Sequence, residues 1–156
     1  GARARARGVT CMVDFHGADL VAAVDAGRPG IIKINEEEFL ATFGAAGSFA
    51  DGESVGADEA DLVSLVESTS AGLGAVIVVT RGERDVVAAD SGAAVVGKVE
   101  PVVPVNVIGC GDSFSAGFVR AWVSRHDLAF AMAEGSRCAA LNARSIRPGS
   151  LRAGLE

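Results

Sequence analysis

The stretch VNVIGCGDSFSAGF, residues 105–118, decides the fold of this chain. Within it, Gly109, Cys110 and Gly111 form a turn of small residues that opens directly into a helix beginning near Asp112. The backbone N–H groups of such a turn point into one concavity, and the helix dipole adds positive potential there. The stretch therefore predicts a binding site for a phosphoryl group or another anion at the start of a helix.

A carboxylate at the start of this helix has two interpretations. Asp112 could accept a proton from a hydroxyl group that attacks a phosphorus atom, which is the work of a general base in a kinase. Alternatively, Asp112 only caps its helix while the glycines make a turn. The spacing alone favours neither interpretation, so the rest of the chain has to decide between them.

Strands and helices alternate on the N-terminal side of this stretch. Apolar runs predict strands over residues 9–15, 30–34 and 75–80. The apolar spacing predicts helices over residues 17–27, 35–44 and 57–72. Between them, residues 44–56 are rich in Gly, Ala and Ser and predict a loop.

The remaining segments complete an α/β fold. Residues 86–99 predict a hairpin that turns at Asp90, Ser91 and Gly92, and residues 111–125 and 128–142 predict two consecutive helices. Strands that alternate with helices predict one domain built on a mostly parallel sheet with helices on both faces. Ligands of such a sheet bind at the C-terminal ends of its strands.

Composition excludes several classes of partner. The 156 residues carry 14 Lys and Arg against 20 Asp and Glu, and a formal net charge of −6 gives no attraction for nucleic acid or anionic lipid. The most apolar stretch, residues 75–79, is far shorter than the ~20 residues that cross a bilayer. The three cysteines and two histidines have the spacing of neither a disulfide framework nor a zinc site. We therefore expect a cytoplasmic protein that binds neither nucleic acid nor membranes.

A second candidate segment is IKINEEEF, residues 32–39, at the junction of a strand and a helix. Asn35 and Glu38 are three residues apart, so both side chains lie on one side of the first helical turn and could hold the water shell of Mg²⁺. Lys33 could meet a phosphate group. Taken alone, however, the segment favours a capped and solvated acidic helix start with no ligand.

A third candidate segment is TRGERD, residues 80–85. Thr80 ends a buried strand, and Gly82 allows the close backbone approach that a nucleobase or a phosphate needs. Taken alone, this segment indicates an ordinary turn.

Together and in this order, the three segments resemble the C-terminal half of the ribokinase and minor phosphofructokinase family, the pfkB carbohydrate kinases. The family's DTxGAGD signature appears as NVIGCGD, its KPNxxE as KINEEE, its TxGxxG as TRGERD, and its upstream D-S-G as DFHG. The resemblance covers roughly residues 9–151 and implies a Rossmann-like, ribokinase-type three-layer sandwich. Asn106 and INEEEF suggest the sugar-phosphate branch, with tagatose-6-phosphate and fructose-1-phosphate kinases.

The resemblance implies a role for each matching residue. Asp112 matches the catalytic base, and Gly109, Cys110 and Gly111 match the anion hole for the transferred phosphate. The region that binds Mg²⁺ and the phosphates of ATP is matched by Lys33, Asn35 and Glu38, with Glu38 and Asn35 near the metal. The nucleotide-binding turn is matched by Thr80 and Gly82, and the adenine pocket by Asn142. The resemblance thus implies ATP and Mg²⁺ as cofactors and a small-molecule sugar or sugar phosphate as substrate.

Several residues depart from the family pattern: Ile34 replaces Pro, Val107 replaces Thr, Cys110 replaces Ala, and Asp85 replaces the second Gly of the nucleotide turn. Asp85 would repel polyphosphate unless Arg81 or Arg84 compensates its charge. Members of the family are also longer than this chain. We therefore expect residues 1–156 to be a kinase-domain fragment whose sugar-binding half and lid lie elsewhere, and to be inactive alone.

Two other nucleotide-binding classes do not fit. GCGDSF lacks the third glycine of a dinucleotide-binding GxGxxG, and neither lysine, Lys33 or Lys98, lies in a GKS or GKT sequence. The alternative that stays open is a non-catalytic nucleotide-binding half or remnant that needs a partner chain. The sequence also leaves open the identity of the sugar and whether the protein is a homo-oligomer.

Overall fold

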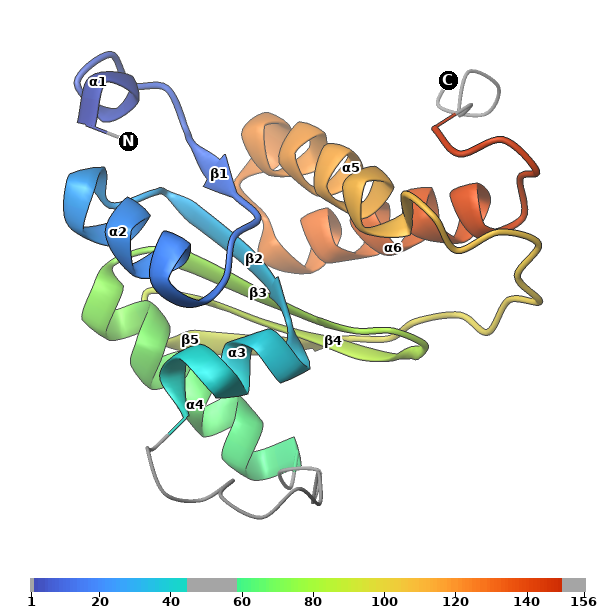
Figure 1. Ribbon diagram of the computed structural model, residues 1–156, viewed down its shortest axis with the longest axis horizontal. Helices are drawn as coiled ribbons and strands as arrows, with labels where there is room; N and C mark the ends of the chain where they lie inside the picture. The colour runs from blue at the N-terminus through green and yellow to red at the C-terminus, as the bar shows by residue number, and fades with distance from the viewer. Residues whose placement is uncertain (1, 45–58, 150–156) are drawn as a thin grey trace. The chain divides into compact units, whose positions relative to one another are not determined.

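The computed structural model describes residues 2–44 and 59–149. They belong to two compact units, one within residues 1–82 and 87–95 and the other within residues 83–86 and 96–156. The larger unit contains the three candidate strands of the N-terminal region and their helices. The smaller unit contains the turn at Gly109 and the two helices that follow it. Figure 1 shows the order of the elements along the chain.

The sheet has five strands in the order β1-β2-β3-β4-β5. Strands β1 (Met12–Val13), β2 (Ile31–Asn35) and β3 (Val76–Arg81) pair in parallel, and in this register Asn35 lies opposite Thr80. Strands β4 (Arg84–Asp90) and β5 (Ala93–Gly97) follow through two-residue turns, which are hairpin connections. The C-terminal ends of β2 and β3 therefore carry two of the three candidate segments side by side.

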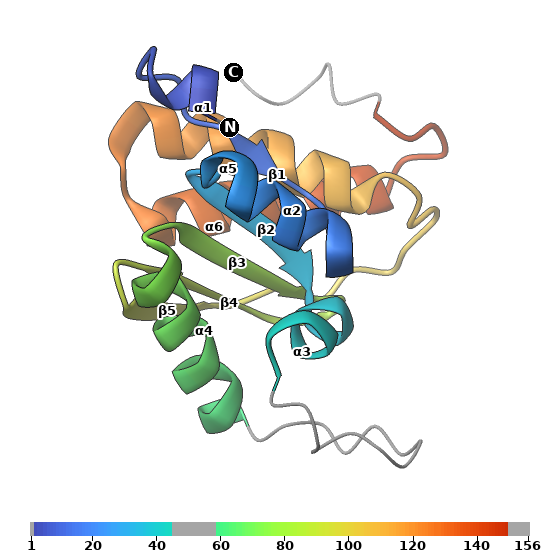
Figure 2. The same ribbon diagram turned by 60° about the vertical axis from the view of Figure 1, so that its left-hand side comes forward.

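Three helices of the first unit pack against one face of the sheet (Figure 2). They are α2 (Gly17–Gly27), α3 (Glu36–Phe43) and α4 (Glu59–Leu73). Because side chains alternate along a strand, every second residue of β2 and β3 points to this face. The fully buried core there is formed by Leu20, Ile32, Ile34, Phe39, Leu62, Val66, Ile77, Val79, Val87 and Ala89.

The second unit is built on two helices, α5 (Cys110–Arg125) and α6 (Leu128–Ala143), that pack closely along their lengths. Small residues make this approach possible. A Cβ at Gly117 would lie 2.7 Å from Sγ of Cys138, and a Cβ at Gly135 would lie 2.9 Å from the ring of Phe114. The side chain of Asp127 caps α6 by accepting a hydrogen bond from the N–H of Phe130 at 2.9 Å.

Most predicted elements are confirmed with small changes at their ends. The main exception is the strand predicted over residues 9–15, which is reduced to Met12–Val13 because Val9 and Phe15 are about half exposed. The short helix α1 (Ala2–Arg5) is not predicted, since its ARAR repeat has no apolar stripe. The loop predicted over residues 44–56 lies almost wholly outside the described residues. Within those residues, no helix combines the length and apolar character that crossing a membrane requires.

Candidate active site

The turn before α5 presents unpaired backbone donors. Gly109 has a φ of +76°, a left-handed conformation that glycine adopts without strain. The N–H of Cys110 donates to the carbonyl oxygen of Val107 at 3.3 Å. Within the described part of the chain, the N–H groups of Gly109, Gly111 and Asp112 have no acceptor. These donors at a helix N-terminus can bind an anion.

Asp112 lies in the first turn of α5, and it is exposed to solvent. Its carboxylate makes no hydrogen bond with the residues that the structure describes. The interpretation of Asp112 as a helix cap is therefore not supported by any observed contact. A free carboxylate next to unpaired N–H groups can accept a proton close to a bound anion.

Asn106 fixes the segment that leads into the turn. Its Oδ1 accepts a hydrogen bond from the N–H of Ile108 at 2.9 Å, and its Nδ2 donates to the carbonyl oxygen of Ile146 at 3.3 Å. The N–H of Asn106 itself donates to the carbonyl oxygen of Ala143 at 3.0 Å. The turn is therefore attached to the end of α6 and to the chain that follows it.

Asn142, which the resemblance assigns to the adenine pocket, is fully buried. Its Nδ2 donates to the carbonyl oxygen of Ile108 at 2.8 Å and approaches Sγ of Cys110 at 3.4 Å. Its Oδ1 accepts a hydrogen bond from the N–H of Gly149 at 2.8 Å. The amide is therefore engaged within the protein, against the candidate anion-binding turn.

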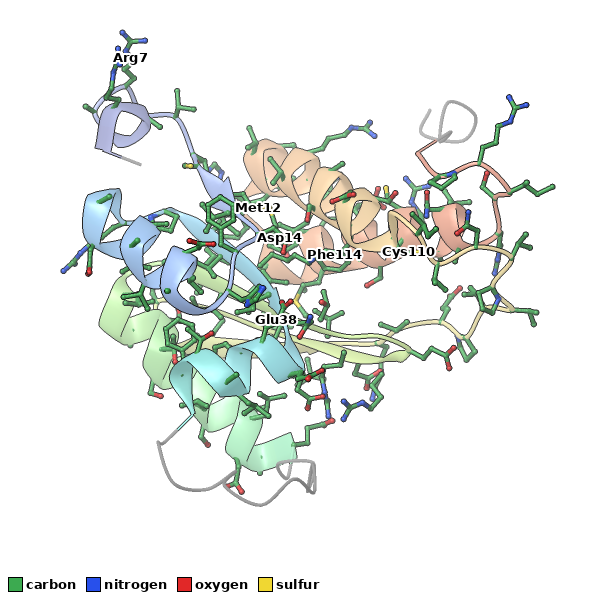
Figure 3. All side chains as sticks on the ribbon, viewed as in Figure 1. Arg7, Met12, Asp14, Glu38, Cys110 and Phe114 are labelled. Carbon is green, nitrogen blue, oxygen red and sulfur yellow. The ribbon has the colours of Figure 1, made fainter. Side chains whose placement is uncertain are left out.

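Lys33 is paired with a residue to which sequence reasoning assigned no role. Its Nζ lies 2.8 Å from Oδ2 of Asp14, and the Lys33 side chain is only 9% exposed. Asp14 follows directly after β1 (Figure 3). Asp14 stands first in the DFHG segment, which was the only available signal. A phosphate group near Lys33 would have to compete with this carboxylate.

Asn35 and Glu38 form a capping box at the start of α3. Oδ1 of Asn35 accepts a hydrogen bond from the N–H of Glu38 at 2.9 Å, and Oε2 of Glu38 accepts one from the N–H of Asn35 at 3.4 Å. This is the capped helix start that the segment alone favours. Oε1 of Glu38 lies outside this box, 3.9 Å from Nε2 of His16.

The residues around Glu38 are compatible with a weakly held divalent cation. The described residues contain no cluster of three His, Cys, Asp or Glu side chains that could hold a metal alone. Mg²⁺, however, is commonly bound by one or two carboxylates, water and substrate phosphates. Oε1 of Glu38 is a hard oxygen donor left over by the capping box, so Glu38 fits this kind of binding.

Thr80 and Gly82 flank a buried arginine at the end of β3. The Thr80 hydroxyl lies 3.5 Å from the carbonyl oxygen of Ile34, and Gly82 has a φ of +66° in the turn to β4. The side chain of Arg81 is 5% exposed and pairs with Glu36 at 3.3 Å and Glu59 at 2.9 Å.

Lys98, which is not one of the partners expected from the sequence, compensates part of the charge of Asp85. Oδ2 of Asp85 pairs with Nζ of Lys98, and its Oδ1 accepts a hydrogen bond from the N–H of Val99 at 3.3 Å. Arg81, one of the two expected partners, forms its ion pairs with Glu36 and Glu59 instead.

The candidate residues form one group in each unit. The group in the first unit lies at or near the C-terminal ends of β2 and β3 and consists of Lys33, Asn35, Glu38, Thr80 and Gly82. The group in the second unit lies where α5 begins and α6 ends and consists of Gly109, Cys110, Gly111, Asp112 and Asn142. Sequence reasoning missed Asp14, and it did not identify the contacts of Asn142.

Comparison with known proteins gives a family match over almost the whole chain. The model of the pfkB family carbohydrate kinases matches residues 2–151. The fructoselysine 6-kinase of Shigella flexneri is 40% identical over 83 residues, which are 53% of this chain and 31% of that protein. The fructoselysine 6-kinase of Escherichia coli K12 is 37% identical over the same length. The chain thus spans about one third of the length of these relatives.

Solved structures confirm the predicted fold class. Phosphofructokinase-2 from Escherichia coli, in complex with potassium, superposes with a TM-score of 0.77 at 21% identity, over 92% of this chain and 44% of that one. Adenosine kinase from Sinorhizobium meliloti gives 0.73 at 19% identity, over 95% and 43% of the two chains. The predicted α/β fold of the ribokinase type is therefore correct.

Proposed function

Because the chain belongs to the pfkB family of carbohydrate kinases, we propose that it carries the nucleotide-binding and phosphoryl-transfer residues of an ATP-dependent sugar kinase. The acceptor is a hydroxyl group of a small-molecule sugar or sugar phosphate. The observation that carries this proposal is the turn before α5, where unpaired N–H groups stand beside the free carboxylate of Asp112.

The proposed chemistry of this turn follows from its donors. The N–H groups of Gly109 and Gly111 stabilise negative charge on the phosphoryl group as it is transferred, because they are held in place before the reaction begins. Asp112 accepts the proton of the attacking hydroxyl group. The Gly109–Gly111 turn thus acts as the anion hole. Cys110 helps to shape this turn but does not supply a free donor, because its N–H is bonded to the carbonyl oxygen of Val107.

The nucleotide and its cation are assigned to the first unit. Thr80 and Gly82 approach the nucleotide at the end of β3, and Lys33 and Asn35 lie near its phosphates. Glu38 holds Mg²⁺ through water by the oxygen that its capping box leaves over, with Asn35 beside it. When bound, Mg²⁺ neutralises charge on the phosphate oxygens.

The acceptor has two candidate classes. Asn106 and INEEEF favour a sugar phosphate of the tagatose-6-phosphate or fructose-1-phosphate kinase type. The 40% identity to a fructoselysine 6-kinase favours fructoselysine instead. We keep both, because the shared region is only 31% of that relative.

A second function is favoured by the short coverage of the relatives named above. The chain corresponds to 31% of fructoselysine 6-kinase and 44% of phosphofructokinase-2. It could therefore act as a non-catalytic nucleotide-binding half that associates with a partner chain or a second copy.

Two measurements separate these functions. Isothermal titration of the 156-residue chain with MgATP distinguishes a nucleotide-binding protein from a remnant that binds none. Phosphoryl-transfer assays on the chain with its partner or remaining segment, using fructose 6-phosphate, tagatose 6-phosphate, fructose 1-phosphate and fructoselysine, identify the acceptor. Asp127→Asn is the matched control for Asp112→Asn, because an amide also caps α6. Transfer that survives Asp112→Asn would contradict the proposal.

A further inference from the structure

Asn142 is a buried polar side chain in contact with the candidate anion-binding turn. It is 0% exposed, and both ends of its amide have partners in the protein. We propose that Asn142 is a positioning residue: it orients the N–H of Gly109 toward the phosphate and does not itself touch the nucleotide. This inference rests on the proposed function of the turn.

The orientation follows from the geometry of one peptide bond. The carbonyl oxygen of Ile108 accepts a hydrogen bond from Nδ2 of Asn142 at 2.8 Å, so this carbonyl points toward α6. The chain contains no cis peptide among its described residues, and in a trans peptide the C=O and the following N–H point in opposite directions. The N–H of Gly109 therefore points away from Asn142, and it is one of the unpaired donors of the turn.

The same amide also fixes the chain after α6. Oδ1 of Asn142 accepts the N–H of Gly149 at 2.8 Å, and a Cβ built on Gly109 would lie 3.5 Å from Pro148. Rotating the Asn142 side chain would leave Ile108 and Gly149 without these partners in a buried place, which is costly. One side chain thus holds the turn before α5 against the segment that follows α6.

A nucleotide-contacting role would require part of the amide to be available. Nδ2 contacts the carbonyl oxygen of Ile108 and Sγ of Cys110, and Oδ1 accepts a hydrogen bond from the N–H of Gly149. An adenine ring could reach these atoms only by replacing contacts that shape the turn. Burial and hydrogen bonding therefore favour the positioning role over the adenine pocket.

One variant separates the contacts of Asn142, and a second serves as its control. Asn142→Asp keeps the acceptor for the N–H of Gly149 and removes the donors to Ile108 and Cys110. Ser145→Ala is the matched control, because it removes the hydrogen bond between this hydroxyl and the carbonyl of Arg147 in the same C-terminal segment and leaves the Ile108 contact intact. Thermal unfolding monitored by circular dichroism establishes that each variant is folded.

The first readout needs no ligand. In ¹⁵N-labelled chain, Asn142→Asp should shift the amide resonance of Gly109 and change the alkylation rate of Cys110, whereas Ser145→Ala should leave both near the wild-type values. Equal changes in both variants, or no change in Asn142→Asp, would overturn the positioning role. If Asn142→Asp does not fold, hydrogen exchange of the Asn142 side-chain amide in the wild-type chain decides: unprotected exchange would also overturn it.

The second readout uses two probes, MgATP and magnesium tripolyphosphate, titrated by calorimetry. The loss of about two hydrogen bonds at the turn should weaken binding of both probes by the same factor, about tenfold, in Asn142→Asp. Weaker binding of MgATP alone would show an adenine contact and overturn the inference. If the wild-type chain binds neither probe, the proposed function fails. The ligand-free measurements on Gly109 and Cys110 still test whether Asn142 positions the turn.

Discussion

Nζ of Lys33 lies 2.8 Å from Oδ2 of Asp14, and this ion pair joins β2 to the residue that follows β1. The two side chains differ in exposure, 9% for Lys33 against 44% for Asp14. Removing the carboxylate leaves a nearly buried ammonium group without this partner, whereas removing the ammonium leaves a carboxylate that water can solvate. The two halves of the pair are therefore unequal for stability.

We expect Asp14→Asn to lower the free energy of unfolding by about 1–3 kcal/mol. Lys33→Met should cost less, because its apolar side chain suits the buried position. Urea denaturation of both variants measures the difference. A larger loss for Lys33→Met would show that the ammonium group has stabilising partners beyond Asp14. The same variant tests the proposed phosphate contact, since Lys33→Met should weaken MgATP binding.

Asp112→Asn should reduce phosphoryl transfer by about 100-fold or more in any preparation that phosphorylates a sugar, because the amide cannot accept the proton. The dissociation constant of MgATP should change little, since the N–H groups of the turn are unaltered. Turnover and calorimetry measure the two effects. Asp127→Asn should leave both values unchanged, and a wild-type turnover of Asp112→Asn would remove Asp112 from the reaction.

Gly117 and Gly72 should respond in opposite directions to alanine. A Cβ at Gly117 would lie 2.7 Å from both Sγ of Cys138 and the backbone oxygen of Glu134, so α5 and α6 would have to separate. We expect Gly117→Ala to cost about 1–3 kcal/mol of unfolding free energy. Gly72, near the end of α4, has nothing within 4 Å of that position.

Gly72→Ala should therefore stabilise the chain by about 0.5–1 kcal/mol, because alanine loses less backbone entropy in a helix. The two variants share one chemical change, so their comparison isolates helix packing. Denaturant unfolding measures both variants. If Gly117→Ala has the same free energy of unfolding as the wild-type chain, the two helices can move apart without cost.

Cys138 should be the slowest of the three cysteines to react with iodoacetamide. Burial raises the pKa of its thiol, and only 3% of the residue is exposed. A raised pKa keeps the reactive thiolate scarce until the pH approaches that pKa, so its alkylation should rise more steeply above about pH 9 than that of an exposed thiol.

Cys110 is half-buried at the candidate anion-binding turn, and we expect it to react fastest. MgATP should protect it if the turn binds phosphate. Mass spectrometry of the alkylated peptides measures the three rates separately. Faster reaction of Cys138, or equal reaction of Cys110 with and without MgATP, would contradict the proposed position of the phosphate.

Local patterns predicted most elements because their causes are local. Asn35 and Glu38 are three residues apart, so their capping box is visible in the sequence, and the left-handed Gly109 agrees with the predicted small-residue turn. The partners of Lys33 and Asn142 could not be predicted in the same way. Asp14 is 19 residues from Lys33, and Ile108 is 34 residues from Asn142, so only the folded chain brings them together.

The first strand shows a further limit of pattern reading. The sequence predicts a short buried strand over residues 9–15, yet only Met12 and Val13 pair with β2. A strand extends only where its backbone lies beside a neighbouring strand, and β1, at the edge of the described sheet, has β2 as its one neighbour. The length of a strand therefore depends on its neighbours in the sheet, and the local sequence does not show where those neighbours lie.

The last prediction concerns residues 1–156 without other polypeptide: we expect them to fold but to show little or no sugar kinase activity. A kinase must hold the acceptor hydroxyl in line with the γ-phosphate, and fixing that geometry can account for about 7–11 kcal/mol of the barrier. The chain spans 31% of fructoselysine 6-kinase and 44% of phosphofructokinase-2, and its candidate residues are assigned to nucleotide and phosphate rather than to a sugar. Within the described residues β1 pairs only with β2, and an open sheet edge favours association with other chains.

Assays of the purified chain with the four acceptors, combined with light scattering, test this prediction. We expect MgATP binding without sugar phosphorylation, in a preparation that contains assemblies larger than a monomer. The Asp112→Asn variant is the control for contaminating kinases, because it lacks the proposed base and should keep the fold, so any activity in its preparation comes from other enzymes. Turnover on the order of 1 per second or faster from a monodisperse monomer, absent in Asp112→Asn, would show that these residues alone position the acceptor.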